Sequence, residues 1–429
     1  MTPLCSGRAL LGPQASSPAL LTLERFSGYK AGEDACGPEE RALNIGASLR
    51  VPRGCRMPAP NKNISALLAE RIASGDFPSA TYLVAERGET VFADALGYSV
   101  VEPYRIANKL DTIYDLASLT KPLITGLLCS RRIELGELTL DSSVSHYVPE
   151  FDRTDKQMIT VRELLTHSAG LPAWRPLYLL TEDEPERTAG AIASLDLEYK
   201  PGTRVIYSDL GFITLGILLE RITGHPIAEL AHKEIIEPLK LDHTFFNPEL
   251  ALQTGIAACE NGNNYERDMC EQMGAGIYSN SRQRMIWGEV HDGNAYFLGG
   301  AAGHAGLFST AGEMLVLANQ FLPQHTSLLK PESCALFRSN MTEGLEEARS
   351  LGWQLAATKE STAGPDLPAD SFGHNGFTGT SCWVDAQHDR VFILLTNRTH
   401  ARQLPFANIN QVRRQFHSLA GHEVSTATR

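Results

Sequence analysis

No stretch of this 429-residue sequence approaches the roughly 18 consecutive apolar residues that a membrane-spanning helix requires. Charged residues, glycine or proline interrupt the longest apolar runs within a few positions. Residues 1–23 carry one arginine and no compact apolar segment, which disfavours a secretory signal. We therefore expect no membrane span. The compartment stays open: cytoplasmic for the sequence as written, and periplasmic if the true start differs.

Basic residues are also in deficit, with 38 Lys and Arg against 50 Asp and Glu, for a net charge of −12 at pH 7. Nucleic acids are not expected as the main partner, because binding to phosphates requires a basic face. The eight cysteines include no Cys-x-x-Cys pair and no short regular spacing, so neither a zinc cage nor a disulfide scaffold is indicated. We expect most of them to be small buried residues.

The composition is otherwise that of a globular protein, with 43% hydrophobic and 21% charged residues. The length allows one large two-lobed domain or two ordinary domains. Residues 1–60 are rich in Gly, Pro, Ser and Ala and lack a sustained helical or strand period. They are predicted to form an N-terminal extension that is poorly ordered, followed by the folded part at 61–429.

The first periodic elements are predicted to be a helix and a hairpin. Apolar residues recur at helical spacing from Ile64, and a Gly-Asp-Phe-Pro break follows at 75–78. Residues 79–86 and 89–96 are then typical of two strands joined by a tight Arg87-Gly88 turn.

The middle of the chain, from about 115 to 223, is predominantly helical in pattern. Capping boxes are predicted at Thr160 with Glu163 and at Thr310 with Glu313. The end of the chain returns to strands at 380–384 and 391–395, with a last helix near 410–419. Strands at both ends with helices between them predict an α+β fold: one sheet, an inserted helical part, and a cleft between the two.

A serine and a lysine three residues apart carry the first candidate chemistry. In Ser118-Leu119-Thr120-Lys121 the two side chains share one helix face, so the amine can reach the hydroxyl. A buried lysine can lose its charge and deprotonate a serine, which is otherwise a weak nucleophile. Pro122 suits a first helical turn, which places Ser118 near the positive end of the helix dipole. By itself, this spacing also arises by chance on solvated helices.

The whole segment 115–122, Asp-Leu-Ala-Ser-Leu-Thr-Lys-Pro, resembles the nucleophile segment of class C β-lactamases, DD-peptidases and related esterases. A second segment, Tyr207-Ser208-Asp209, resembles the family's Tyr-x-Asn loop, in which the tyrosine shares proton transfer with the lysine. The resemblance assigns Tyr207 that role, and a phenol beside an ammonium is expected to have a lowered pKa. Asp209 replaces the usual asparagine, which exchanges an amide donor for a carboxylate and leaves open how the substrate amide is held. Taken alone, Tyr207 would more often be a half-buried core residue whose hydroxyl finds a partner.

A third segment, His374-Asn375-Gly376, resembles the family's Lys-Thr-Gly or His-Thr-Gly strand motif. The resemblance implies that His374 orients the substrate carboxylate or the proton network, and that Asn375 and Asp209 contact substrate. It implies that Gly376 lets backbone approach the substrate closely. The backbone N–H groups of Ser118 and Phe377 would form the oxyanion hole. Alone, the segment could be a glycine-rich turn.

Three motifs in the family's order imply a β-lactamase-like fold: an antiparallel sheet flanked by helices, with an inserted helical subdomain. The sheet lobe would comprise about 61–118 and 296–429, and the helical lobe about 119–295. The mechanism needs no cofactor. A metal site at His291, Asp292 and His304 is conceivable, but no ligand spacing supports it, and a hydrogen-bonded loop network is favoured.

The resulting functional prediction is a serine hydrolase that forms an acyl-enzyme at Ser118, acting on D-alanyl amides or β-lactams as a DD-carboxypeptidase or β-lactamase does. One alternative is a carboxylesterase for short acyl esters. Esterases of this family often carry Trp-x-Gly where this chain has His374, which favours the first prediction. Another alternative is a slow-turnover penicillin-binding or sensor module. The partner would be a small-molecule or peptide substrate, and no pattern indicates the oligomeric state.

Overall fold

The computed structural model describes residues 59–427, except 153–154 and 277. The predicted extension, residues 1–60, lies outside the described residues apart from its last two positions. The predicted boundaries between the sheet lobe and the helical lobe, near residues 118 and 296, remain predictions.

The centre of the fold is a seven-stranded sheet in the order β3-β2-β1-β9-β8-β7-β6, in which every neighbouring pair is antiparallel. Its strands come from the two ends of the described chain: β1 (Ser79–Glu86), β2 (Glu89–Val100), β3 (Ile106–Ala107), β6 (Gln354–Leu355), β7 (Phe372–Asn375), β8 (Ser381–Asp385) and β9 (Arg390–Thr396). A separate pair consists of β4 (Tyr114–Asp115) and β5 (Phe308–Ser309). The α+β class predicted from the sequence is confirmed.

The predicted hairpin is confirmed as β1 and β2, and β2 continues four residues past its predicted end, to Val100. Arg87 and Gly88 form the connection, with φ of 53° and 76°. Positive φ at both central residues is typical of the tight turn whose twist matches the flanking strands.

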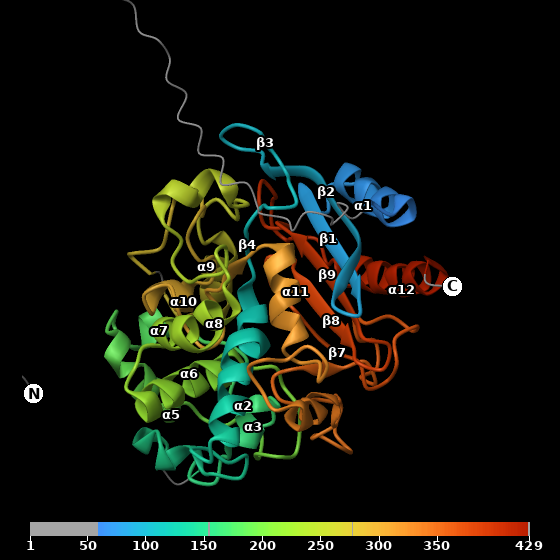
Figure 1. The fold of residues 1–429 in the computed structure, drawn as a ribbon. Coiled ribbons are helices and arrows are strands. Elements are labelled where there is room, and N and C mark those ends of the chain that lie inside the picture. The colour runs from blue at the N-terminus through green and yellow to red at the C-terminus, as the bar shows by residue number, and fades with distance from the viewer. Residues whose placement is uncertain (1–58, 153–154, 277, 428–429) are drawn as a thin grey trace, which may run out of the picture. The chain divides into compact units, whose positions relative to one another are not determined.

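Strands from opposite ends of the chain meet where β1 pairs with β9. Alternate side chains of this pair point to opposite faces of the sheet. Tyr82 and Leu394 pack in the cluster under α1 (Lys62–Ala73) and α12 (Asn410–Ala427), whereas Leu83 and Ile393 belong to the larger core on the other face. Helix α11 (Ala311–Asn319) covers that second face (Figure 1). Burial on both faces explains why these strands are apolar throughout.

The remaining helices gather to one side of the sheet in Figure 1. They are α2 (Leu127–Glu134), α3 (Val161–Leu165), α4 (Leu177–Leu180), α5 (Thr188–Ser194), α6 (Asp209–Thr223), α7 (Ile227–Ala231), α8 (Glu237–Leu239), α9 (Asn264–Met273) and α10 (Gly293–Phe297). Glycines allow close packing here: a Cβ on Gly303 would lie 2.1 Å from the carbonyl oxygen of Phe212 in α6.

Of the two predicted capping boxes, one forms completely. Thr160 accepts from the backbone N–H of Glu163, and the Glu163 carboxylate accepts in return from the Thr160 N–H. Thr310 caps α11 in the same way, but Glu313 does not reach back. Its carboxylate instead accepts from the N–H groups of Asp242 and His243. The second prediction was therefore half wrong, because a tertiary contact competes for the glutamate.

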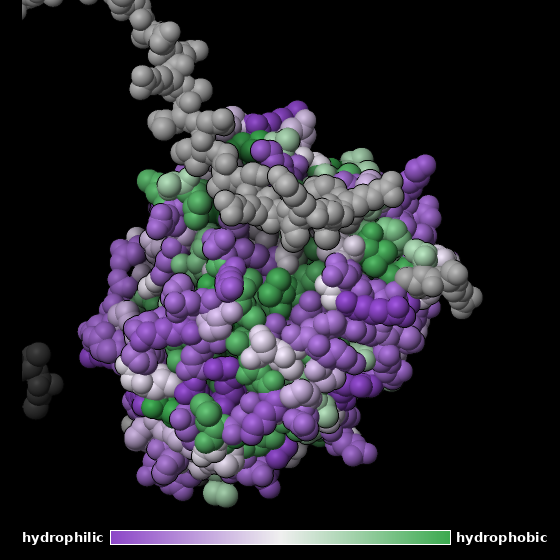
Figure 2. All heavy atoms as spheres, viewed as in Figure 1, coloured by the Kyte–Doolittle hydropathy of each residue, from purple (hydrophilic) through white to green (hydrophobic). Residues whose placement is uncertain are grey.

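The surface and the cysteines agree with the composition. Polar residues cover most of the face drawn in Figure 2. The five cysteines in the described part of the chain are free and buried, as predicted: Cys129, Cys259, Cys270, Cys334 and Cys382. Among the described residues of 59–427, no helix combines the length and apolarity needed to cross a bilayer.

Candidate active site

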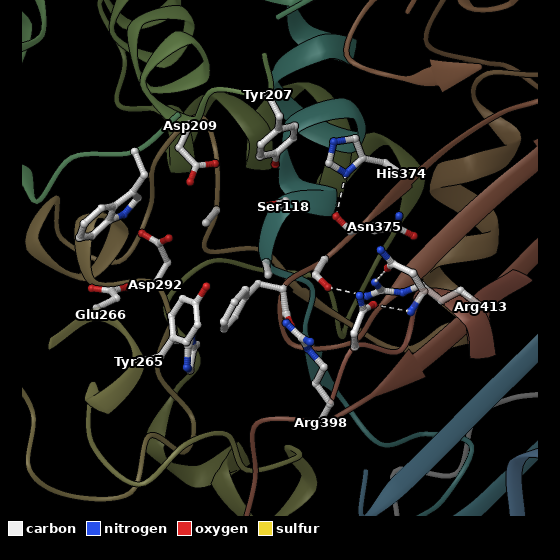
Figure 3. A pocket seen from close by; sticks show the side chains of 18 of the residues that line it. Ser118, Tyr207, Asp209, Tyr265, Glu266, Asp292, His374, Asn375, Arg398 and Arg413 are labelled. Atoms are coloured by element: carbon white, nitrogen blue, oxygen red, sulfur yellow. Dashed lines mark hydrogen bonds between the residues drawn. The ribbon is translucent and has the colours of Figure 1, made fainter. Parts of the chain in front are cut away.

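A cleft of about 470 Å³ opens beside β7 and collects the predicted site residues. Side chains or backbone of seven predicted residues line it: Ser118, Tyr207, Asp209, His374, Asn375, Gly376 and Phe377. The eighth, Lys121, is completely buried next to Ser118. Figure 3 shows Tyr207, Asp209 and His374 along one side of Ser118. The structure thus brings together residues that the sequence separates by more than 250 positions.

Ser118 lies in a sharp turn between β4 and the helix that follows. The turn is a single 3-10 turn, Ala117–Leu119, followed by a π-helical segment, Lys121–Gly126, that runs into α2. Ala117 has φ of 48°, a conformation that costs free energy in a residue with a Cβ. The buried Asp115 carboxylate stabilises it by accepting from the Ala117 N–H at 2.8 Å.

Lys121 makes three polar contacts at its ammonium. Nζ donates to Ser118 Oγ at 3.0 Å and to the backbone carbonyl of His304 at 3.1 Å, and it forms an ion pair with Asp209 Oδ1 at 2.7 Å. The prediction that the amine reaches the serine hydroxyl is confirmed. Two of the three ammonium hydrogens are thus donated in hydrogen bonds, and the Asp209 carboxylate contacts Nζ as an ion pair.

The charge state of Lys121 differs from the expectation that burial would neutralise it. Burial does lower its pKa, but the attraction of Asp209, together with Tyr207, outweighs burial and leaves the pKa raised. The lysine is therefore an ammonium in the resting enzyme. The sequence does not reveal this charge state, because it depends on Asp209, the last residue of the Tyr207-Ser208-Asp209 segment, which reaches Lys121 only in the folded chain.

Tyr207 lies directly over the ammonium, with Nζ 4.9 Å from its ring centre. Burial raises the pKa of its hydroxyl, and the opposing effects of Lys121 and Ser118 do not compensate. The predicted lowering of this pKa is therefore wrong, and the phenol is protonated. The Tyr207 ring packs against the ring of His167, with 4.5 Å between the ring centres. His167 Nδ1 also accepts a hydrogen bond from the backbone N–H of Ser208, the residue after Tyr207.

His374, on β7, is neutral. Burial lowers its pKa well below the usual value, and the nearby Lys121 and Arg349 lower it further. Its Nδ1 donates to the carbonyl of Asn375 at 2.9 Å, which leaves Nε2 as a buried acceptor with no hydrogen bond in the described residues. A neutral ring supplies an acceptor for the proton network but no charge for a substrate carboxylate.

Gly376 is needed for a contact within the protein. A Cβ there would lie 2.4 Å from the carbonyl oxygen of Leu116 and 2.0 Å from Thr380 Oγ1. The glycine thus lets the cleft wall approach the segment that carries Ser118, in addition to any approach to substrate. Its neighbour Asn375 accepts from Thr362 through its side-chain oxygen, which fixes the amide.

The two backbone groups predicted as an oxyanion hole both border the cleft. In the described ranges, neither the Ser118 N–H nor the Phe377 N–H donates to another backbone or side-chain group. Their role remains a prediction. The Phe377 side chain packs in an aromatic cluster with Tyr265, 4.7 Å away, and His291, 5.3 Å away between ring centres, and both of these residues also line the cleft.

Three arginines that no sequence motif indicated also line the cleft: Arg349, Arg398 and Arg413. Arg349 is paired with Glu347. Arg413, only 5% exposed, donates to the carbonyls of Gly376 and Thr380 at 2.7 and 2.9 Å. Burial, together with the nearby Arg398, lowers the pKa of Arg413 to about 9. In the described part of the chain, neither Arg398 nor Arg413 forms an ion pair with a carboxylate.

Acidic residues line the opposite side of the cleft, where Figure 3 shows Asp209, Asp292 and Glu266. Asp292 caps α10 and accepts from His304 Nε2 at 2.9 Å. His291 instead contacts Glu260 at 2.9 Å. The hydrogen-bonded network favoured for this loop is thus confirmed. Among residues 59–427, as far as they are described, no three His, Cys, Asp or Glu side chains are grouped to hold a metal ion.

A buried lysine that contacts a serine hydroxyl at the mouth of a cleft, beside an antiparallel sheet with helices on both faces, defines a class of serine hydrolase. The family comparison agrees: the model described as Beta-lactamase matches residues 64–414. The chain belongs to the β-lactamase family, and it is a serine hydrolase.

Relatives and solved structures support this placement. The chain is 31% identical over 373 residues to an N-acetylmuramyl-L-alanine amidase of Bacillus subtilis, covering 79% of this chain and 81% of the relative. It is 32% identical over 354 residues to a protein of Escherichia coli K12 named as a candidate D-alanyl-D-alanine carboxypeptidase, covering 76% and 79%. The fold is shared with EstCE1, a hydrolase with promiscuous acyltransferase activity: the TM-score is 0.64 at 23% identity, over 83% of this chain and 97% of that one.

Proposed function

We propose that this serine hydrolase cleaves an amide bond whose leaving group carries a free carboxylate, as in peptides that end in D-alanyl-D-alanine. β-Lactams would act as mimics of that substrate. The observation that carries the proposal is the pair Arg398 and Arg413, which line the cleft without a carboxylate partner in the described residues.

A buried cation without a counter-ion costs free energy, which an anionic ligand offsets. Arg413 is held by the carbonyl of Gly376, next to the proposed oxyanion donor at Phe377. A carboxylate bound there would lie on the β7 side of the cleft. Since a hydrogen bond to a charged group contributes about 1.5–3 kcal/mol, the arginines would discriminate roughly 10- to 150-fold between a carboxylate and a neutral group.

The names of the relatives support an amide substrate. The Bacillus subtilis relative is named for an amide of L-alanine and the Escherichia coli relative for a D-alanyl-D-alanine bond. In the proposed reaction Ser118 attacks the carbonyl, the N–H groups of Ser118 and Phe377 hold the oxyanion, and Tyr207 with Lys121 passes a proton to the leaving amine. Water then hydrolyses the acyl-enzyme.

The test is the release of D-alanine from an acylated Lys-D-Ala-D-Ala peptide, compared with the same peptide ending in a C-terminal amide. We expect turnover of the free acid, with kcat/KM at least tenfold above that of the amide. Replacing Arg413 with Gln should remove most of this preference by weakening the binding of the acid only. N-acetylmuramyl-L-alanyl peptide, benzylpenicillin and p-nitrophenyl esters are assayed in parallel.

Equal turnover of acid and amide would contradict the carboxylate subsite. Turnover of the muramyl peptide alone would mean that the enzyme cleaves the amide bond between the sugar and L-alanine. Turnover of p-nitrophenyl esters alone would favour the carboxylesterase alternative. A penicillin adduct that persists without hydrolysis of any peptide would instead favour a slow-turnover binding module.

A further inference from the structure

The contacts of Lys121 restrict where the serine proton can go. The ammonium donates hydrogen bonds to Ser118 Oγ and to the His304 carbonyl, and Asp209 Oδ1 lies 2.7 Å from Nζ as an ion pair. In this state Nζ has no lone pair with which to accept the proton of Ser118. One hydrogen must leave Nζ before, or as, the serine is deprotonated. Of the three contacted groups, only Asp209 is a carboxylate, and a carboxylate accepts a proton more readily than a hydroxyl or a peptide carbonyl does.

We propose that Asp209 is the proton acceptor of the acylation step, and that Lys121 relays the proton to it from Ser118. The relay is defined by two contacts that meet at one atom: 3.0 Å from Ser118 Oγ to Nζ and 2.7 Å from Nζ to Asp209 Oδ1. The proposal does not depend on which substrate the enzyme takes.

Atoms and charge are conserved in the proposed step. The Ser118 Oγ–H bond breaks and its electron pair forms the bond to the carbonyl carbon, while the carbonyl π pair moves to the oxygen. Nζ receives the serine proton and gives one of its own to Asp209 Oδ1. The lysine stays an ammonium, the aspartate becomes a neutral acid, and the negative charge moves to the oxyanion. The proton returns through Nζ to the leaving group when the intermediate collapses.

The location of Asp209 allows substrate to trigger this transfer. Its side chain is 18% exposed and lines the cleft, and its second oxygen has no hydrogen bond or ion pair in the described ranges. Water therefore reaches the carboxylate in the free enzyme. A substrate that fills the cleft removes this water, and desolvation favours the neutral acid over the carboxylate.

Neighbouring groups do not provide an equivalent acceptor. The Tyr207 phenol is protonated, and His374 makes no contact with Nζ. The titratable or charged groups that face the Lys121–Asp209 pair are Tyr207, His374, His167, Arg349 and Asp292. Of these, Asp292 is the only carboxylate, and it is engaged with His304.

The test measures the rate at which p-nitrophenyl acetate acylates Ser118 in Asp209→Asn, from pH 6 to 10. At pH 7 we expect a loss of about 100-fold or more, the usual effect of removing a general base. The rate should recover as pH rises, because a buried Lys121 without its partner loses its proton to solvent. The wild-type rate should stay level between pH 7 and 9. Asp209→Glu, which retains a carboxylate, should restore part of the rate.

The fold should tolerate the substitution, because Ser208 and not Asp209 caps α6. Thermal unfolding checks this, and Asp141→Asn, at a side chain that is 80% exposed, is the matched control. The proposal is overturned if Asp209→Asn is acylated at the wild-type rate with the wild-type pH profile, or if Asp209→Glu is no faster than Asp209→Asn. The ester reports on Ser118 whether or not the carboxylate subsite exists, so the two proposals fail separately.

Discussion

At the scale of single residues, Gly376 couples the cleft wall to the nucleophile. Its Cα faces the Leu116 carbonyl, two residues before Ser118, with no room for a methyl group. We predict that Gly376→Ala lowers stability by about 1–3 kcal/mol, the usual effect of overpacking, and slows labelling of Ser118. Chemical denaturation and labelling kinetics measure both. Gly190→Ala, in α5 with nothing within 4 Å, is the control and should be slightly stabilising.

The serine and lysine could be predicted from the sequence because their contact is local, three residues apart on one helical segment. The charge of Lys121 could not, because it depends on the approach of Asp209, 88 positions later. The cleft arginines were missed for a similar reason. Each is a common residue with no motif around it, and only the folded chain brings Arg349, Arg398 and Arg413 to one cleft.

At the scale of elements, the N-terminus of α6 positions both Tyr207 and Asp209. Ser208 lies between them, accepts from the Gly211 N–H at 3.3 Å and donates to the Pro172 carbonyl at 2.7 Å. We predict that Ser208→Ala lowers stability by about 1–2 kcal/mol, as the loss of a buried N-cap does, and also lowers kcat. Ser194→Ala, which removes an exposed hydroxyl at the end of α5, should change stability by less than about 0.5 kcal/mol.

Elements with a clear period were predicted accurately, since β1 runs over the predicted residues 79–86. The strand β7 was harder to recognise. Its four residues, Phe372–Asn375, include a glycine whose Cβ would lie 2.1 Å from the Trp383 ring on β8. Pairing with β8 stabilises this strand, and no local propensity could reveal it.

At the scale of the whole molecule, buried neutral histidines link stability to pH. Burial lowers the pKa of His417 to about 3, and those of His167 and His374 lie well below the usual value. In the unfolded chain a histidine has a pKa near 6.5, so as pH falls it is protonated in the unfolded state before it is protonated in the folded state. Protonation stabilises the unfolded state, and the stability that is present above pH 6.5 is therefore lost as pH falls. Glu266, whose pKa burial raises to about 7, acts in the opposite direction.

We predict that His417→Asn makes the loss of unfolding free energy between pH 7 and pH 5 smaller by about 2 kcal/mol. Urea denaturation of both proteins at the two pH values measures this difference. An unchanged pH dependence would mean that His417 is charged, or reaches water, in the folded protein. The control is His422→Asn, because His422 is an exposed histidine near the end of α12.

The overall architecture followed from the sequence because strands at both ends of the chain surround a helical middle, and three motifs fixed the family resemblance. The seven-stranded sheet and the family match to residues 64–414 confirm it. The arrangement of acidic side chains on one side of the cleft and arginines on the other could not be predicted, since these residues come from segments that meet only in the folded chain.

The central claim is that Ser118 is the nucleophile and that Lys121 activates it. The most direct measurement is reaction with a fluorophosphonate, followed by intact-protein mass and peptide mapping. We predict a single adduct on Ser118, no adduct in Ser118→Ala, and labelling at least about 100-fold slower in Lys121→Met. An adduct on another residue, or undiminished labelling of either variant, would contradict the account.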